Sequence, residues 1–210
     1  MKKTILSILV LGGLLSFGEA KAQSFGLRGG INFQNLTGKD NNGNDFSNKL
    51  TTRFHGGVNV SIPVATDFVV RPEVLYVGKG AKSPAGNDYR INYIEVPVNL
   101  IYKPKLGNGN LMLGFGPYVG FGVGGKVEFT NGTEHDVKFE ENVTNPQAGV
   151  AYYRKTDAGA NVLGGYDFGR FSVQLNAQLG LANMYPEFNG IEPNAKIKNT
   201  GFGLSLGLDL

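Results

Sequence analysis

The sequence feature that most constrains this chain is a two-residue period of apolar side chains, which recurs in eight segments. In residues 24–34, every second position is Phe25, Leu27, Gly29, Ile31 and Phe33, and Gly, Arg, Asn and Gln lie between them. Because successive side chains of a β-strand point to opposite sides, this pattern predicts strands that are apolar on one face only. The predicted strands cover about 24–34, 53–62, 68–79, 92–103, 111–124, 160–168, 170–182 and 201–210.

The connections between these strands are alternately long and short. The long ones are residues 35–52, 80–91, 125–159 and 183–200, and the short ones are 63–67, 104–110 and 167–170. An even strand number, with short turns at one end and long loops at the other, is typical of bacterial outer-membrane barrels. The sequence therefore predicts an all-β fold, an eight-stranded antiparallel up-and-down transmembrane β-barrel, with both termini on the periplasmic side.

The composition of the two strand faces predicts which face points outward. One face is rich in Gly, Asn, Ser and Gln, which suits a narrow filled interior, so the apolar face is expected to contact outer-membrane lipid. Aromatic residues near both ends of the apolar faces are expected to form two girdles at the membrane interfaces. The turn-end girdle would contain Phe25, Phe68, Tyr102, Phe168 and Phe171, and the loop-end girdle Phe33, Phe54, Tyr76, Phe121 and Phe202.

The first 22 residues have the organisation of a secretory signal peptide. Lys2 and Lys3 precede the apolar stretch 5–17, and Ala20-Lys21-Ala22 forms a small-residue cleavage site. The apolar stretch is shorter than the roughly 20 residues that a membrane-spanning helix needs. We expect residues 1–22 to be removed and residues 23–210 to form the barrel domain.

The residue composition excludes several functional classes. There is no cysteine, so the chain has no disulfides, no zinc–thiolate site and no iron–sulfur cluster. The formal net charge is +3, and it falls to about +1 once Lys2, Lys3, Lys21 and Glu19 are removed with the leader, which gives no reason to predict nucleic-acid binding. We predict no cofactor.

The inner face of the predicted barrel carries a small set of ionisable residues. They are Arg28, Arg53, His55, Arg71, Glu73, Glu95, Asp167 and Asp209. Buried charges are costly unless they are paired, and eight strands leave room only for side chains. We therefore predict a salt-bridged plug in preference to an ion path, with Arg28, Arg71, Glu73 and Glu95 in one cluster.

The sequence offers weak candidates for catalysis and metal binding. His55 lies near the outer end of its predicted strand, but no nucleophile motif such as G-x-S-x-G accompanies it, and His135 falls in a predicted mobile loop. Asp40, Asn42 and Asn44 have the spacing of calcium ligands, but the glycine and the bidentate glutamate of an EF-hand are missing. We predict no catalytic, cofactor-binding or metal residue.

Three short motifs lie on the third, fourth and fifth predicted strands. They are Arg71-Pro72-Glu73-Val74-Leu75-Tyr76 with Gly78-Lys79-Gly80, then Tyr93-Ile94-Glu95-Val96-Pro97, then Gly116-Pro117-Tyr118-Val119-Gly120. In this order they resemble the porin-family outer-membrane β-barrel domain, PorT-like, of Bacteroidetes-type bacteria. The resemblance covers residues 23–210 and implies an outer-membrane barrel. Some relatives belong to a protein-secretion machinery, so the resemblance leaves that role open.

Two classes of function are compatible with this sequence. The first is a non-catalytic protein of the envelope that recognises a partner through its outer loops, chiefly residues 125–159 with their mixed charges. The second is a lipid- or peptide-modifying enzyme that uses His55. The sequence favours the first, because loops on a rigid scaffold commonly carry recognition and no second catalytic group near His55 can be named.

Overall fold

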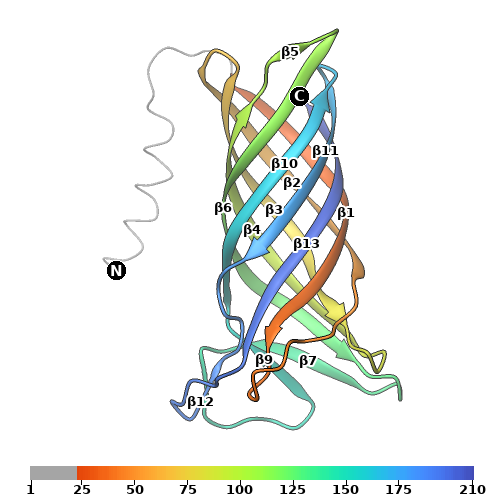
Figure 1. Cartoon of the computed structure of the whole chain (residues 1–210), viewed down its shortest axis with the longest axis vertical. Coiled ribbons are helices and arrows are strands. Elements are labelled where there is room, and N and C mark those ends of the chain that lie inside the picture. The colour runs from red at the N-terminus through yellow and green to blue at the C-terminus, as the bar shows by residue number, and fades with distance from the viewer. Residues whose placement is uncertain (1–22) are drawn as a thin grey trace.

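The computed structural model describes residues 23–210, in which eight long strands close into an antiparallel barrel (Figure 1). The strands are β1 (Ser24–Lys39), β2 (Thr51–Ala65), β3 (Phe68–Lys82), β4 (Asp88–Tyr102), β6 (Gly109–Glu128), β10 (Thr156–Asp167), β11 (Phe171–Gly180) and β13 (Lys196–Asp209). Pairing of β13 with β1 and of β10 with β6 closes the ring. The predicted fold class is confirmed, while the predicted signal peptide lies outside the described residues.

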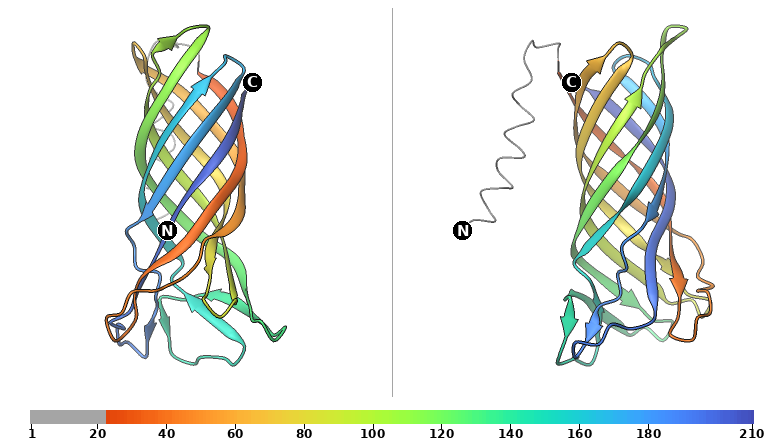
Figure 2. Two further views of the ribbon diagram at one scale, coloured as in Figure 1. Left: turned by 45° about the vertical axis from the view of Figure 1, so that its right-hand side comes forward. Right: turned by 60° about the vertical axis from the view of Figure 1, so that its left-hand side comes forward.

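Five short strands lie at the two ends of this barrel. They are β5 (Lys105–Leu106), β7 (Glu134–Phe139), β8 (Asn142–Val143), β9 (Val150–Tyr153) and β12 (Glu187–Phe188). β7 pairs antiparallel with the last residues of β6 on one side and parallel with β9 on the other. Figure 2 shows β7, β9 and β12 gathered at the end with the long loops, here called the loop end.

The opposite end, here called the turn end, holds the short connections and both ends of the described chain. The backbone N–H of Leu210 donates to the carbonyl of Phe25 over 2.9 Å. The C-terminus lies at the end of the barrel opposite to β7 and β9 (Figure 1). Between residues 23 and 210 the structure contains no helix long and apolar enough to cross a membrane.

The outer wall carries the apolar side chains of the alternating pattern. Nine of the ten residues proposed for the girdles are more than a third exposed, and the tenth, Phe33, is half-buried with its ring 5.2 Å from that of Phe202. At the turn end the rings of Phe68 and Tyr102 lie 5.1 Å apart. The contact of these rings with the membrane interfaces stays a prediction.

The strands extend further toward the loop end than the alternation predicted. The largest difference concerns residues 125–159, which contain the end of β6, all of β7, β8 and β9, and the start of β10. A bulge in the β4–β6 pairing, where Tyr93 faces Gly122 and Asn92 faces Gly124, reverses the inward and outward positions of β6. Val123 is therefore exposed while Val127 is buried, and the two-residue period is lost at this point of the sequence.

An apolar cluster closes the barrel at the loop end, which the sequence analysis did not predict. Phe139 of β7 packs across the mouth, and a Cβ at Gly122 would lie 2.2 Å from its ring. The ring of Tyr93 is 6.1 Å from that of Phe139. The buried members of this apolar cap are Leu36, Ala81, Ile91, Tyr93, Val127, Val137, Tyr153 and Met184.

Candidate functional site

The charged residues of the lumen form two clusters at different depths. The cluster nearer the turn end centres on Glu73, whose Oε1 lies 3.0 Å from Nη1 of Arg28 and 3.3 Å from Nε of Arg71. Asn99 donates to the same oxygen over 3.1 Å, and Arg71 donates to Gln174 over 2.7 Å. These contacts join β1, β3, β4 and β11 across the interior.

The second cluster, the Lys79 centre, lies between the first cluster and the apolar cap. Nζ of Lys79 is 2.6 Å from Oε2 of Glu95 and 3.0 Å from Oδ2 of Asp157, and all three side chains are fully buried. Gln178 donates to Glu95 over 2.5 Å, and Asn199 donates to Asp157 over 2.8 Å. Buried ions persist only when they are paired and further hydrogen-bonded, and both conditions are met here.

The Lys79 centre corrects the predicted cluster of Arg28, Arg71, Glu73 and Glu95. In the β3–β4 register Arg71 faces Asn99, and Glu95 lies four residues further along β4, about 13 Å from Asn99. Glu95 is therefore too far from Arg71 and pairs with Lys79 instead. Sequence reasoning also missed two members of the centre. Lys79 ends its predicted strand, and Asp157 falls in the segment assigned to a loop, although both continue the inward alternation of β3 and β10.

The other predicted lumen residues occupy separate places. His55 hydrogen-bonds through Nε2 to Oγ of Ser205 over 2.8 Å, in the buried interior. Asp167 forms an ion pair with Lys103 at the turn end, where Asp209 lines the same small cavity.

Arg53 does not join the lumen clusters, which corrects its predicted place. Its Nη2 donates to Asp88 over 2.5 Å and to the carbonyl of Tyr89 over 3.2 Å, at the beginning of β4. Arg53 still pairs with Asn32 of β1, but the β2–β3 pairing ends at His55 and Val77, so its side chain lies above the lumen clusters, toward the loop end.

The two lumen clusters balance each other in charge. The turn-end cluster has two cations and one carboxylate, whereas the Lys79 centre has one cation and two carboxylates.

The cavity lined by Arg71, Lys103 and Asp167 measures only about 10 Å³, roughly the volume that one water centre needs. No group of three or more potential metal ligands occurs among residues 23–210.

This packing predicts that the barrel conducts little or no ionic current. Arg28, Arg71, Glu73, Glu95 and Tyr118 occupy the inner face, and an ion could pass only if these pairs separated. Recordings in planar bilayers should show no stable steps above the baseline of bilayers that received detergent alone. Large, long-lived steps from heat-modifiable, folded protein would contradict the prediction.

The three motifs that carry the family resemblance meet in the Lys79 centre. They supply Lys79 from β3, Glu95 and Tyr93 from β4, and Tyr118 from β6, which are neighbouring strands. Nζ of Lys79 lies 4.2 Å from the centre of the Tyr118 ring and 5.5 Å from that of Tyr93, within the range of cation–π attraction. The motifs therefore build the interior of the fold.

The loop end contains a cleft of about 460 Å³, here called the aromatic cleft. Four chain segments form it, and its aromatic lining residues are Phe46, Tyr89, Tyr152, Tyr153, Tyr185 and Phe188. Arg154 holds two of the segments together, because its backbone N–H donates to Met184 and its guanidinium lies 3.5 Å from Glu192. Burial raises the pKa of Tyr153, so its hydroxyl stays neutral.

Two loop-end predictions can be compared with the structure here. His135 lies on β7 with its ring 4.6 Å from that of Phe129, so its predicted place in a mobile loop is wrong. Asp40 accepts the backbone N–H groups of Asn42 and Asn44, each over 2.9 Å. The bond from Asn44 is the main reason that the pKa of Asp40 is lowered.

Two solved structures are similar to this chain. The Ail attachment invasion locus protein of Yersinia pestis, in complex with the heparin analogue sucrose octasulfate, shares 11% identity and a TM-score of 0.42 over 90% of this chain and 99% of its own. Neisserial surface protein A shares 11% identity and a TM-score of 0.49 over 90% of this chain and 100% of its own.

A search of curated protein sequences finds no match. The family model described as the outer membrane protein beta-barrel domain matches residues 20–185, more than half of the chain. This chain therefore belongs to the outer membrane protein beta-barrel domain family.

Proposed function

We propose that this protein is a non-catalytic outer-membrane barrel that recognises an envelope or extracellular partner through its loop end. The observation that carries the proposal is the aromatic cleft, which loop residues and the ends of strands form together at the loop end. Clefts of several hundred cubic ångströms lined by aromatic rings are typical binding sites, and tyrosine combines a flat apolar face with a polar hydroxyl.

The loop end has the rigidity that a recognition site needs. β7 pairs with both β6 and β9, and the apolar cap anchors this short sheet on the barrel. Rigid aromatic side chains lose little conformational entropy on binding. In this proposal the signal peptide, residues 1–22, is removed, the turn end with both termini faces the periplasm, and residues 125–159 contribute β7, β8 and β9 to the outer surface.

The geometry around His55 favours a structural role over catalysis. Its partner Ser205 has 1% of its surface exposed and lies against Asn176, to which it donates over 3.1 Å. His55 itself has only 6% of its surface exposed. A nucleophile must reach its substrate, so we propose that this buried pair stabilises the interior.

The PorT-like resemblance also allows a role in protein secretion, but no feature of the candidate site supports that alternative. Its motifs build the Lys79 centre inside the barrel, which a partner in the envelope cannot contact. We therefore rest the proposed function on the aromatic cleft alone.

The cleft hypothesis predicts that a double variant, Tyr185→Ser with Phe188→Ser, loses its partner. Photo-crosslinking in intact cells followed by affinity purification should recover the partner with the unmodified protein and at least tenfold less with the variant. Both positions lie outside the eight strands of the barrel wall, so heat-modifiable gel migration of the barrel should be unchanged.

Ile191→Ser provides the matched control, because Ile191 is 72% exposed in the same loop and does not line the cleft. It should keep the partner. If the double variant recovers every partner that the unmodified protein recovers, recognition through the aromatic cleft is wrong.

A further inference from the structure

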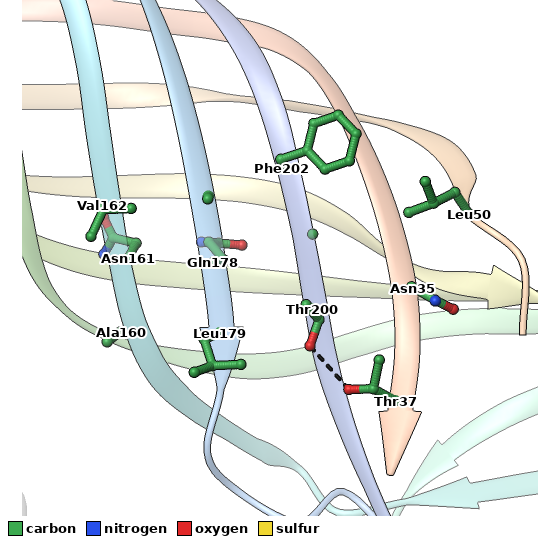
Figure 3. A pocket seen from close by; sticks show the side chains of 12 residues that line it. Asn35, Thr37, Leu50, Ala160, Asn161, Val162, Gln178, Leu179, Thr200 and Phe202 are labelled. Carbon is green, nitrogen blue, oxygen red and sulfur yellow. Dashed lines mark hydrogen bonds between the residues drawn. The ribbon is translucent and has the colours of Figure 1, made fainter. Parts of the chain in front are cut away.

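The outer wall of the barrel carries an apolar depression of about 650 Å³, here called the outer groove (Figure 3). It crosses β10, β11, β13 and β1 and is lined chiefly by Leu50, Ala160, Val162, Ala177, Leu179 and Phe202. The strand register explains the hollow, since Val162, Ala177 and Phe202 are direct neighbours across three strands. The alanine leaves a gap between two larger side chains.

The outer groove continues toward the turn end along β10, β11 and β13. A second depression of about 330 Å³ shares Val162, Ala177 and Phe202 with it and extends to Leu175. Leu175 and Leu179 are both more than half exposed. The combined hollow therefore runs along the lipid-facing wall, where an extended hydrocarbon chain could lie.

Toward the loop end the outer groove becomes polar and then cationic. The hydroxyls of Thr37 and Thr200 hydrogen-bond over 3.0 Å at its margin, as Figure 3 shows. The next outward positions on β1 and β13 form the lysine rim, which consists of Lys39, Lys196 and Lys198. Lys39 faces Lys196 and Thr37 faces Lys198 in the register.

The lysine rim is available for an anionic ligand. Lys39 and Lys196 are exposed and Lys198 is partly exposed. Within residues 23–210 the lysines that form ion pairs are Lys79, Lys103 and Lys126. The neighbouring carboxylate of Asp40 accepts hydrogen bonds from its own loop.

We propose that the outer groove and the lysine rim bind a phosphorylated, multiply acylated glycolipid of the outer leaflet, with an acyl chain in the outer groove and phosphate at the lysine rim. Lys198 lies two residues beyond Thr200, about 7 Å along the strand, so a headgroup attached to the chain meets the cations directly. Basic residues beside an apolar membrane surface attract anionic lipid headgroups. The threonine hydroxyls between them can bond to sugar hydroxyls.

The charge of the lysine rim distinguishes this occupant from a second copy of the chain. A two-fold symmetric contact through the outer groove would bring equivalent surfaces together, and like charges oppose such a contact. The inference rests on the proposed orientation, in which the loop end lies at the outer leaflet. It is independent of the partner of the aromatic cleft.

The test uses the full chain expressed in a Gram-negative host and purified from its outer membrane in mild detergent. After delipidation, native mass spectrometry measures binding of diphosphorylated lipid A, of phosphatidylcholine and of inorganic phosphate. We expect lipid A to bind at least tenfold more tightly than phosphatidylcholine. Millimolar phosphate should not displace it, since phosphate lacks the acyl chain.

Two variants separate the contributions of charge and shape. The rim variant carries Lys39→Gln, Lys196→Gln and Lys198→Gln, and the groove variant carries Ala177→Phe, which fills the hollow with an apolar ring. Each should lose at least tenfold in affinity for lipid A. Retention of unmodified affinity by either variant would overturn the proposal, as would equal binding of phosphatidylcholine.

Matched controls exclude general effects of charge, bulk and misfolding. Lys105→Gln, Lys138→Gln and Lys155→Gln together remove the same charge from exposed positions outside the lysine rim, and Val173→Phe adds the same ring to β11 outside the outer groove. Both controls should bind lipid A within about twofold of the unmodified protein. The Tyr185→Ser and Phe188→Ser variant should do the same, which distinguishes failure of this site from failure of the aromatic cleft.

Discussion

Replacing Lys79 with methionine is expected to destabilise the barrel by about 3–5 kcal/mol, or to prevent its folding, because two fully buried carboxylates would lose their cation. Methionine keeps most of the side-chain length, so the effect is one of charge. A urea titration of protein folded into lipid vesicles, followed by heat-modifiable gel migration, measures the change as a lower midpoint.

Two further variants make the result specific. Adding Asp157→Asn to Lys79→Met removes one of the two unpaired charges and should recover part of the loss. Lys126→Met breaks the ion pair with Glu134, whose side chain, like that of Lys126, is about half exposed, so little or no change in the midpoint is expected. An unchanged midpoint for Lys79→Met would show that the Lys79 centre does not stabilise the fold.

The second large effect is expected at Gly57 of β2. A Cβ on this residue would lie 2.0 Å from the carbonyl oxygen of Val74 and 2.8 Å from Cα of Leu75. Both atoms belong to the backbone of β3, so alanine fits only if the paired strands separate. We expect Gly57→Ala to cost about 3 kcal/mol or more, at or above the upper end of ordinary overpacking in a core.

The neighbouring glycine provides the control for this substitution. A Cβ on Gly56 would meet its nearest atom, the carbonyl oxygen of Arg28, at 3.8 Å, which is an ordinary contact. Gly56→Ala should therefore leave the urea midpoint within about 0.5 kcal/mol of the unmodified protein. Equal urea midpoints for the two variants would show that β2 and β3 can separate enough to accept a Cβ at Gly57 without loss of stability, which would contradict the prediction.

The strand period and the connection lengths were sufficient to predict the barrel. Alternation is a local property, because each residue of a strand points opposite to the one before it. It therefore assigned Arg71, Glu73 and Glu95 to the inner face and Phe54 and Phe202 to the outer wall without knowledge of any strand pairing. The alternation failed to predict the structure in two places, the β6 bulge and the strand ends nearest the loops. At those strand ends the two faces do not differ in polarity, so the sequence shows no two-residue period.

The sequence by itself thus determined the fold class, the strand order and the face on which the residues of the predicted strands lie. Only the tertiary structure decided which residues of the inner face meet, as with Lys79 and Asp157, which are 78 positions apart in sequence. It also decided that Ala177 lies between Val162 and Phe202, and that four separate segments form the aromatic cleft. These contacts depend on the register between strands. The two-residue alternation excludes a slip by one residue, because that would move every side chain to the other face, but a slip by two residues leaves the pattern unchanged.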